Sequence, residues 1–176
     1  MLISVDCALT KSGIAVFDQT RNKIHIAQDI LIKEKKKVRP IHERLVELFE
    51  EMRKIFNTLP KTSHVLVLED RLSRVHINSA LSIESARTTV MLAYYIFCRE
   101  NSLPYEVYYY TPNEVKYIFG GAWAAKKEVV HPKFREKYPG LFLENRSEDV
   151  TDALMLAMYH LLPIESKWKK PAKKKP

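Results

Sequence analysis

The sequence has few cysteines and no long hydrophobic segment. Its two cysteines, Cys7 and Cys98, have no paired spacing, so neither a disulfide framework nor a thiolate zinc site is predicted. The longest apolar run covers nine residues, 90–98, whereas a membrane-spanning helix needs about twenty. No positively charged segment precedes Asp6, so a signal peptide is not predicted. These absences predict a reduced, soluble, cytoplasmic protein that does not bind membranes.

The composition is typical of one folded domain with a basic end. The chain has 176 residues, of which 46% are apolar, which is enough for one ordinary core and too little for two full-sized domains. The formal net charge is +8, and residues 164–176 hold six lysines against one glutamate, so +5 of it lies there. We therefore predict a single domain over residues 1–162 and a basic, disordered tail over residues 163–176. A basic excess favours an acidic partner, most often nucleic acid, while a solubilising tail or a membrane-surface tether are the other interpretations.

Apolar runs and amphipathic segments alternate along the chain. Three strands come first, at residues 2–5, 14–17 and 24–32, with Gly13 as the turn before the second. The later elements are predicted as a helix at 41–56, a strand at 64–68, a helix at 79–99, a strand at 106–110, a short helix from the capping box at 111–114, a helix at 124–138 broken near His131-Pro132, and a helix at 147–162. Three meander strands followed by alternating helices and strands predict an α/β fold with a mixed five-stranded sheet flanked by helices.

Four carboxylates lie where strand ends and a helix face would bring them together. Asp6 closes the first strand and Glu69 closes the fourth, while Asp149 and Asp152 are three residues apart on one face of the last helix. In open α/β sheets, sites form beyond the carboxyl ends of parallel strands. If the first and fourth strands are neighbours, these acids meet there. Such a group needs a strong counter-charge, and Mg²⁺ is a cation that carboxylates and phosphate oxygens bind together.

Each of these residues also has a plainer interpretation. A single acid at a strand end is usually solvated, and an aspartate in a first helical turn usually interacts with the helix dipole. The pattern alone therefore leaves a metal site and ordinary carboxylates both open. Cys7 is interpreted as a small buried residue, and His131 and His160 as structural. One apolar stripe of the long helix fits either the core or a dimer interface: Ile83, Ala86, Val90, Ala93, Tyr94 and Phe97.

Five segments, in order, resemble one family. They are Ile3-Ser4-Val5-Asp6 with Gly13, Val67-Leu68-Glu69, Asn78-Ser79-Ala80-Leu81 with Glu84-Ser85-Ala86-Arg87, Val115-Lys116 with Lys127, and Asp149-Val150-Thr151-Asp152-Ala153-Leu154. The chain resembles RuvC-type Holliday-junction resolvases of the ribonuclease H-like superfamily. In that family these segments are the first catalytic strand with its turn glycine, the second catalytic position, the long helix that carries much of the dimer interface, two lysines near the scissile phosphate, and the closing Asp-x-x-Asp-Ala-Leu. The resemblance extends over residues 2–160.

The sequence departs from the family pattern at two places. Cys7-Ala8 stand where the family usually has Pro-Gly, and Leu72 stands where it often has a phenylalanine that stacks at the junction centre. An apolar wedge at Leu72 remains compatible with the pattern, whereas aromatic stacking there does not. The resemblance therefore supports the chemistry better than the family's sequence preference. These departures would fit a divergent viral member, acting in a host-cell cytoplasm.

The resemblance implies an endonuclease that resolves four-way (Holliday) junctions, and other branched DNA, by paired nicking as a homodimer. It implies that Asp6, Glu69, Asp149 and Asp152 hold two Mg²⁺ ions per active site, with Mn²⁺ as a substitute, and that cleavage leaves 5′-phosphate and 3′-hydroxyl ends. Lys127 would stabilise phosphate charge in the transition state. The other expected DNA contacts are Lys116, Arg74, Leu72, Lys35, Lys36 and Lys37.

Two other functions fit the same residues. A ribonuclease acting on RNA–DNA hybrid would use the same fold and differ in contacts to the 2′-hydroxyl. A non-catalytic junction-binding protein would keep the fold without turnover, although it would have no need to keep all four acids.

Overall fold

The computed structural model describes residues 1–18, 23–32, 39–70, 77–123, 125–141, 146–163 and 166–167. The prediction of a disordered tail falls mostly outside these ranges and stays a prediction. Within the described ranges, no helix combines the length and apolar content that crossing a bilayer requires.

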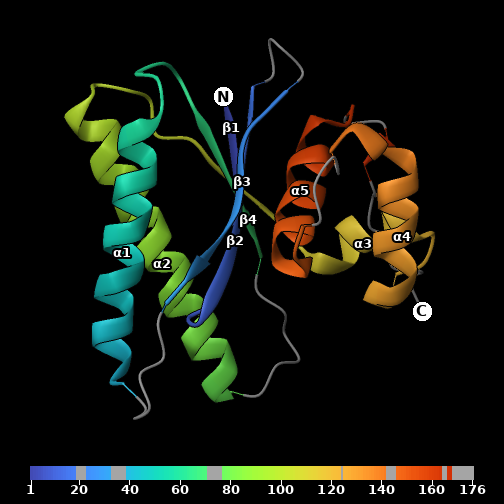
Figure 1. Cartoon of the computed structure of the whole chain (residues 1–176), viewed down its shortest axis with the longest axis horizontal. Coiled ribbons are helices and arrows are strands. Elements are labelled where there is room, and N and C mark those ends of the chain that lie inside the picture. Colours follow the sequence, from blue (N-terminus) through green and yellow to red (C-terminus); the bar gives the residue numbers. More distant parts are fainter. Residues whose placement is uncertain are drawn as a thin grey trace, which may run out of the picture.

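A mixed five-stranded sheet forms the centre of the molecule (Figure 1). Its strands are β1 (Leu2–Asp6), β2 (Lys11–Asp18), β3 (Lys23–Leu31), β4 (Val65–Glu69) and β5 (Val107–Tyr110), in the spatial order β3-β2-β1-β4-β5. The first three strands pair antiparallel, and β4 pairs parallel with both β1 and β5. The predicted fold class is confirmed, and the first and fourth strands are neighbours, which is the condition for their terminal acids to meet.

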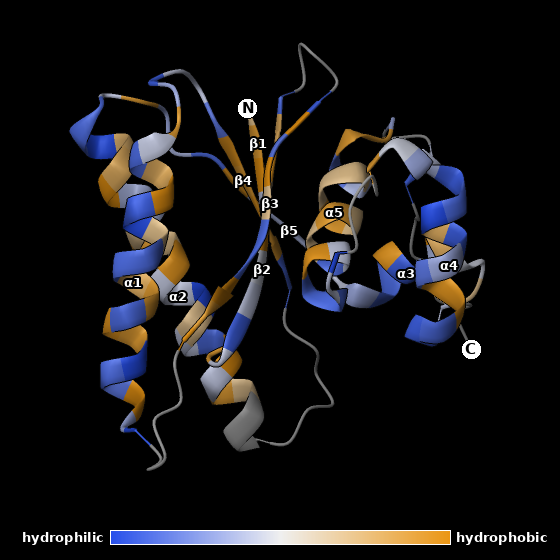
Figure 2. Ribbon diagram, in the orientation of Figure 1, coloured by the Kyte–Doolittle hydropathy of each residue, from blue (hydrophilic) through white to orange (hydrophobic). Residues whose placement is uncertain are grey.

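Helices cover both faces of the sheet. They are α1 (Ile41–Thr58), α2 (Ile77–Glu100), α3 (Pro112–Gly120), α4 (Lys127–Lys137) and α5 (Glu148–Leu161), with a short 3₁₀ turn at Pro139–Leu141. Helices α1 and α2 lie on one face, while α5 packs on the other with α3 and α4 beyond it (Figure 1). Figure 2 shows the apolar sides of α1, α2 and α5 turned toward the sheet.

Strand alternation separates two cores and determines where the strand-end acids point. In β1, Ile3 and Val5 face α1 and α2, whereas Leu2 faces α5. In β4, Leu66 and Leu68 face α1 and α2, whereas Val67 faces α5. Because side chains alternate along a strand, the residues that end β1 and β4 both point to the α5 side.

The predicted starts of α3 and α5 are confirmed by their caps, whereas α2 begins at Ile77 and α4 at Lys127, two residues earlier and three residues later than predicted. Thr111 and Glu114 form a reciprocal capping box at α3, and the Ser147 hydroxyl accepts a hydrogen bond from the Val150 backbone at α5. The Ser147 hydroxyl also donates to Asp29 Oδ1 at 2.6 Å, which ties the start of α5 to β3. Both caps therefore hold helices that border the site described below.

The break predicted near His131-Pro132 is wrong. Helix α4 runs through Pro132 from Lys127 to Lys137. Pro132 lacks the N–H that would bond to the carbonyl four residues earlier, so the helix loses a hydrogen bond. On either side of it, Val130, His131 and Phe134 are buried, and this packing outweighs the local penalty.

Gly13 is not in the turn that the sequence predicts. It lies inside β2, opposite Asp6 in the β1–β2 register, and the turn is closed earlier, where the Ser12 hydroxyl donates to the Ala8 carbonyl at 2.8 Å.

The structure also shows which of the two interpretations of the apolar stripe on α2 holds, core or dimer interface. Five of its six residues are buried against α1 and the sheet, and Ile83 is exposed.

Candidate active site

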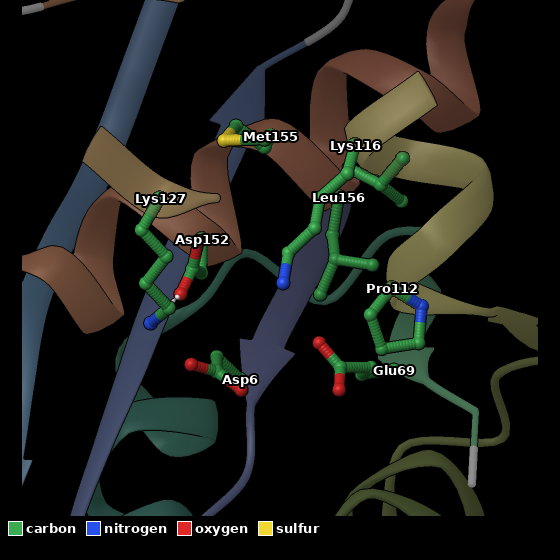
Figure 3. A pocket seen from close by; sticks show the side chains of 9 residues that line it. Asp6, Glu69, Pro112, Lys116, Lys127, Asp152, Met155 and Leu156 are labelled. Carbon is green, nitrogen blue, oxygen red and sulfur yellow. Dashed lines mark hydrogen bonds and ion pairs between the residues drawn. The ribbon is translucent and has the colours of Figure 1, made fainter. Parts of the chain in front are cut away.

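A cavity of about 220 Å³ lies beyond the carboxyl ends of β1 and β4, between them and helices α3, α4 and α5 (Figure 3). It contains three of the four predicted acids and both predicted lysines. Its lining residues are Asp6, Glu69, Pro112, Val115, Lys116, Lys127, Asp152, Met155 and Leu156.

Asp6 and Glu69 are neighbours because β1 and β4 are parallel and in register. Val5 pairs with Leu68, so the next residue of each strand is one of these acids. Burial away from water, reinforced by the Asp152 carboxylate, raises the pKa of Asp6 to about 7. Burial, reinforced by Asp6, raises the pKa of Glu69 to about 8. The ammonium groups of Lys116 and Lys127 lower both pKa values, but they do not offset the effect of burial.

Asp152, in the second turn of α5, has each carboxylate oxygen occupied by a residue of α4. Oδ1 lies 2.8 Å from His131 Nε2, and Oδ2 accepts a hydrogen bond from Lys127 Nζ at 2.5 Å (Figure 3). Burial alone would raise the pKa of Asp152, but these hydrogen bonds outweigh it and lower the pKa. Asp152 is thus the ionised acid of the cavity.

Asp149 is not brought into the cavity. Its Oδ2 forms an ion pair with Lys11 Nζ at 2.9 Å, and Lys11 also contacts Asp29 at 3.4 Å. The hydrogen bond with Asp149 raises the pKa of Lys11. Asp149 still adds negative potential at Asp6, so it lies near the site while facing a different partner.

Arg87 of α2 supports the end of β4. Its guanidinium donates to the Glu69 carbonyl and to Asp70 Oδ1, each at 3.3 Å, and lies 5.3 Å from the Tyr109 ring centroid. Cys7 is buried, and burial raises the pKa of its thiol, so it is not poised as a nucleophile. This agrees with its interpretation as a small buried residue.

Sequence reasoning missed two side chains that hold the acids, Lys11 and His131. Lys127 and His131 are four residues apart on α4 and so share the face that meets Asp152. That spacing was a usable signal, although the interpretation of His131 as structural did not draw on it. Lys11 gave no such signal, because its partner Asp149 is distant in sequence.

Five predicted DNA contacts lie outside the described residues, and their predictions stand untested: Leu72, Arg74, Lys35, Lys36 and Lys37.

The site fits a hard divalent cation by its donor chemistry. Three carboxylates converge on one cavity, and burial together with the neighbouring carboxylates raises the pKa of two of them despite the nearby ammonium groups. Across the described residues, no three acidic, histidine or cysteine side chains already form a cluster placed to hold a metal ion. The lysine contacts are consistent with the lack of such a cluster, since Asp152 is paired with Lys127 and Asp149 with Lys11.

Comparison with solved structures shows the fold. The chain is similar to Thermus thermophilus RuvC in complex with Holliday junction substrate, with a TM-score of 0.65 and 22% identity over 89% of this chain and 90% of that one. A second Thermus thermophilus RuvC structure gives a TM-score of 0.63 and 20% identity over the same shares of the two chains. The yeast mitochondrial Holliday junction resolvase gives a TM-score of 0.51 and 15% identity, over 89% of this chain and 76% of that one.

Comparison of sequences shows the family. RuvC from Caldicellulosiruptor saccharolyticus, a crossover junction endodeoxyribonuclease, is 30% identical over 123 residues, which cover 70% of this chain and 69% of that protein. The family model for crossover junction endodeoxyribonuclease RuvC matches residues 2–160, which include every acid and lysine of the cavity. The chain therefore belongs to the RuvC family of crossover junction endodeoxyribonucleases.

Proposed function

We propose that the protein is a divalent-metal-dependent endonuclease that cuts branched DNA, four-way junctions foremost, as a homodimer. The observation that carries this is the meeting of Asp6, Glu69 and Asp152 with Lys116 and Lys127 around one cavity. Acidic groups beside ammonium groups suit a phosphodiester, whose charge must be neutralised while a P–O bond breaks. The family to which the chain belongs supports the same activity.

Asp6, Glu69 and Asp152, joined by Asp149, would hold two Mg²⁺ ions, with Mn²⁺ as a substitute. When bound, such ions stabilise the attacking and leaving oxygens of the displacement. The chain's own groups prepare the site for this. His131 fixes one oxygen of Asp152, and the Arg87 contact with the Glu69 carbonyl holds the end of β4.

The two lysines would act on the DNA strand. The Lys116 side chain points into the cavity from α3, and Lys127 reaches it from the first turn of α4 (Figure 3). The hydrogen bond to Asp152 outweighs the effect of burial and raises the pKa of Lys127, so this group stays an ammonium throughout the neutral range. We propose that Lys127 stabilises charge on the reacting phosphate and that Lys116 holds the backbone.

Binding of metal should depend strongly on pH. The carboxyl groups of Asp6 and Glu69, with pKa values of about 7 and about 8, must lose their protons before they can hold a cation. Mn²⁺ affinity measured by calorimetry should therefore rise on the order of 100-fold between about pH 6 and about pH 8. An affinity that stays flat over this range would mean that these two acids do not bind the ion.

Helix α2 carries an exposed apolar face that supports the dimer. Leu81, Leu92 and Tyr95 are 57%, 50% and 46% exposed and lie on one side of the helix, at spacings of eleven and three. This face is distinct from the buried stripe of the same helix. A two-fold pairing of α2 helices would give one active site for each of two opposed strands of a junction.

Replacing Leu92 with glutamate should prevent dimer formation, because it would bring a charge from each copy into an apolar contact. Sedimentation at micromolar concentration should show a dimer for the parent and a monomer for Leu92→Glu, and paired nicking of a junction should become single nicking. Val46→Glu, at an exposed position of α1, is the matched control and should remain dimeric. A parent protein that is monomeric on DNA would remove the basis for paired nicking.

The substrate is tested with a synthetic four-way junction, a flap and an RNA–DNA hybrid, each with Mg²⁺ and with EDTA. We expect preferred cleavage of the junction, abolished by EDTA. Cleavage of the hybrid alone would assign a ribonuclease, and tight junction binding without cleavage would assign a binding protein.

A further inference from the structure

Trp123 is an exposed tryptophan held in a fixed orientation. It is 40% exposed, yet its indole N–H and its backbone carbonyl are both engaged by one side chain. With the Asn113 amide assigned in the orientation that satisfies both contacts, its oxygen accepts from Trp123 Nε1 and its nitrogen donates to the Trp123 carbonyl, each at 3.1 Å. The contacts fix the indole edge and leave part of the ring surface accessible.

The loop that carries Trp123 borders the cavity at both ends. It leaves α3 at Gly121, whose left-handed backbone (φ 80°) turns the chain back along the helix toward Asn113 in its first turn. It enters α4 at Lys127, which lines the cavity, and Lys116 lines the cavity from α3. Since Asn113 and Lys116 are three residues apart, Trp123 lies beside the helical turn that carries a cavity lysine.

A second exposed aromatic side chain lies on α3, the helix that precedes the Trp123 loop. Tyr117 is 41% exposed and follows Asn113 by four residues, so it shares the outer face of the helix with the residue that holds Trp123. Single exposed aromatics are ordinary on protein surfaces. Here two of them lie on the helix that carries Lys116 and on the loop that leads to Lys127, and flat π faces near positive charge are the pattern of surfaces that bind single-stranded nucleic acid.

We propose that Trp123, with Tyr117 beside it, stacks on an unpaired nucleobase of the DNA strand whose phosphate lies against Lys116 and Lys127. The stacking proposal rests on the proposed function, because it concerns DNA bound at the same cavity. It extends that function by naming a contact with a base. Where strands exchange at a junction the duplex stack is interrupted, so a base there opens at lower cost than one inside a continuous duplex, and the platform favours branched DNA. The adjacent lysines favour nucleic acid over an apolar protein partner as the occupant.

The test uses fluorescence in a variant with one tryptophan. The chain has two tryptophans, so Trp168→Phe leaves Trp123 as the reporter. In EDTA, adding a four-way junction should quench this fluorescence, whereas adding an equal concentration of duplex should quench it much less. Unchanged fluorescence on a junction that is demonstrably bound would overturn the proposal. Quenching by a protein partner and not by DNA would also overturn it.

Affinity provides the second measurement. Trp123→Ala should weaken junction binding roughly 5- to 150-fold, the range for one stacked base, while Trp123→Phe keeps most of the affinity. The loss should be similar at about 50 and about 200 mM salt, because stacking does not release counterions. Lys116→Ala should instead lose less affinity at the higher salt concentration. Tyr108→Ala, which removes an exposed aromatic packed on His160 at the end of α5 opposite to Asp152, should bind like the parent.

The failure of this proposal is distinguishable from failure of the proposed function. If the parent neither binds nor cuts junctions, the function itself is wrong. If the parent binds and cuts normally and Trp123→Ala binds equally well with unchanged melting temperature, only the stacking role is wrong. An affinity loss in Trp123→Ala that Trp123→Phe does not rescue, at unchanged melting temperature, would also contradict stacking.

Discussion

Asp6→Asn should abolish DNA cleavage while making the metal-free protein more stable. Asp6 lines the cavity together with Glu69 and Asp152, and removing its charge removes a proposed metal ligand. Loss of several kcal/mol of charge stabilisation in the transition state corresponds to a rate decrease of roughly 10³-fold or more. A time course of junction cleavage with Mg²⁺ measures this effect. Cleavage at the parental rate would exclude Asp6 from the catalytic centre.

The stability gain follows from the raised pKa of Asp6. Because burial raises this pKa from 3.8 to about 7, the folded protein retains the proton to higher pH than the unfolded chain does. The contribution of Asp6 to stability is therefore greatest below pH 3.8 and falls as pH rises through 7, above which the ionised group costs at most about 4 kcal/mol. Asparagine removes this cost. The melting temperature of Asp6→Asn should exceed that of the parent at about pH 8 and approach it at about pH 4.

Two controls separate this effect from a general change in charge. Asp18→Asn alters another aspartate at a strand end, at the end of the β1–β2 pair opposite to Asp6, and should preserve cleavage. Adding Mg²⁺ should stabilise the parent more than Asp6→Asn, because binding a cation to the folded state stabilises it by mass action. Equal stabilisation of both proteins by Mg²⁺ would contradict Asp6 as a ligand.

The strand-end acids could be predicted from sequence because local rules determine their positions. A strand that alternates against two cores places its last residue on a known side, and parallel pairing then brings Asp6 and Glu69 together. The same holds for Asp152, since the cap at Ser147 fixes where α5 begins. These features depend on periodicity and caps, which the sequence contains.

The partners of the acids could not be predicted because they depend on how distant elements pack. The pairing of Asp149 with Lys11 requires α5 to lie across β2, and neither segment encodes that crossing locally. The continuity of α4 through Pro132 has the same origin, since buried neighbours outweigh a local penalty. Gly13 is the clearest case. The sequence pattern assigns a glycine before a strand to a turn, whereas Gly13 lies inside a strand and its missing side chain leaves room for the backbone of α5.

Gly13→Ala should be severely destabilising and should displace the first turn of α5. A Cβ at residue 13 would lie 2.1 Å from the Asp149 carbonyl oxygen, 2.2 Å from its carbonyl carbon and 2.6 Å from the Val150 nitrogen. These are backbone atoms, so no side-chain rotation can relieve the clash. Overpacking usually costs about 1–3 kcal/mol, and a clash with rigid backbone should reach roughly 3 kcal/mol or more. Chemical denaturation measures this loss in the free energy of unfolding.

Gly140→Ala is the matched control, because a Cβ there has open space around it, and its stability should stay within about 0.5 kcal/mol of the parent. Any Gly13→Ala protein that still folds must move α5 away from β2. That movement would separate Asp149 from Lys11, and Asp152 from Lys127 and His131. Mn²⁺ affinity and the cleavage rate should therefore fall together, even in the folded fraction. A stable variant with parental metal affinity would mean that the close approach of α5 to β2 does not position the acids.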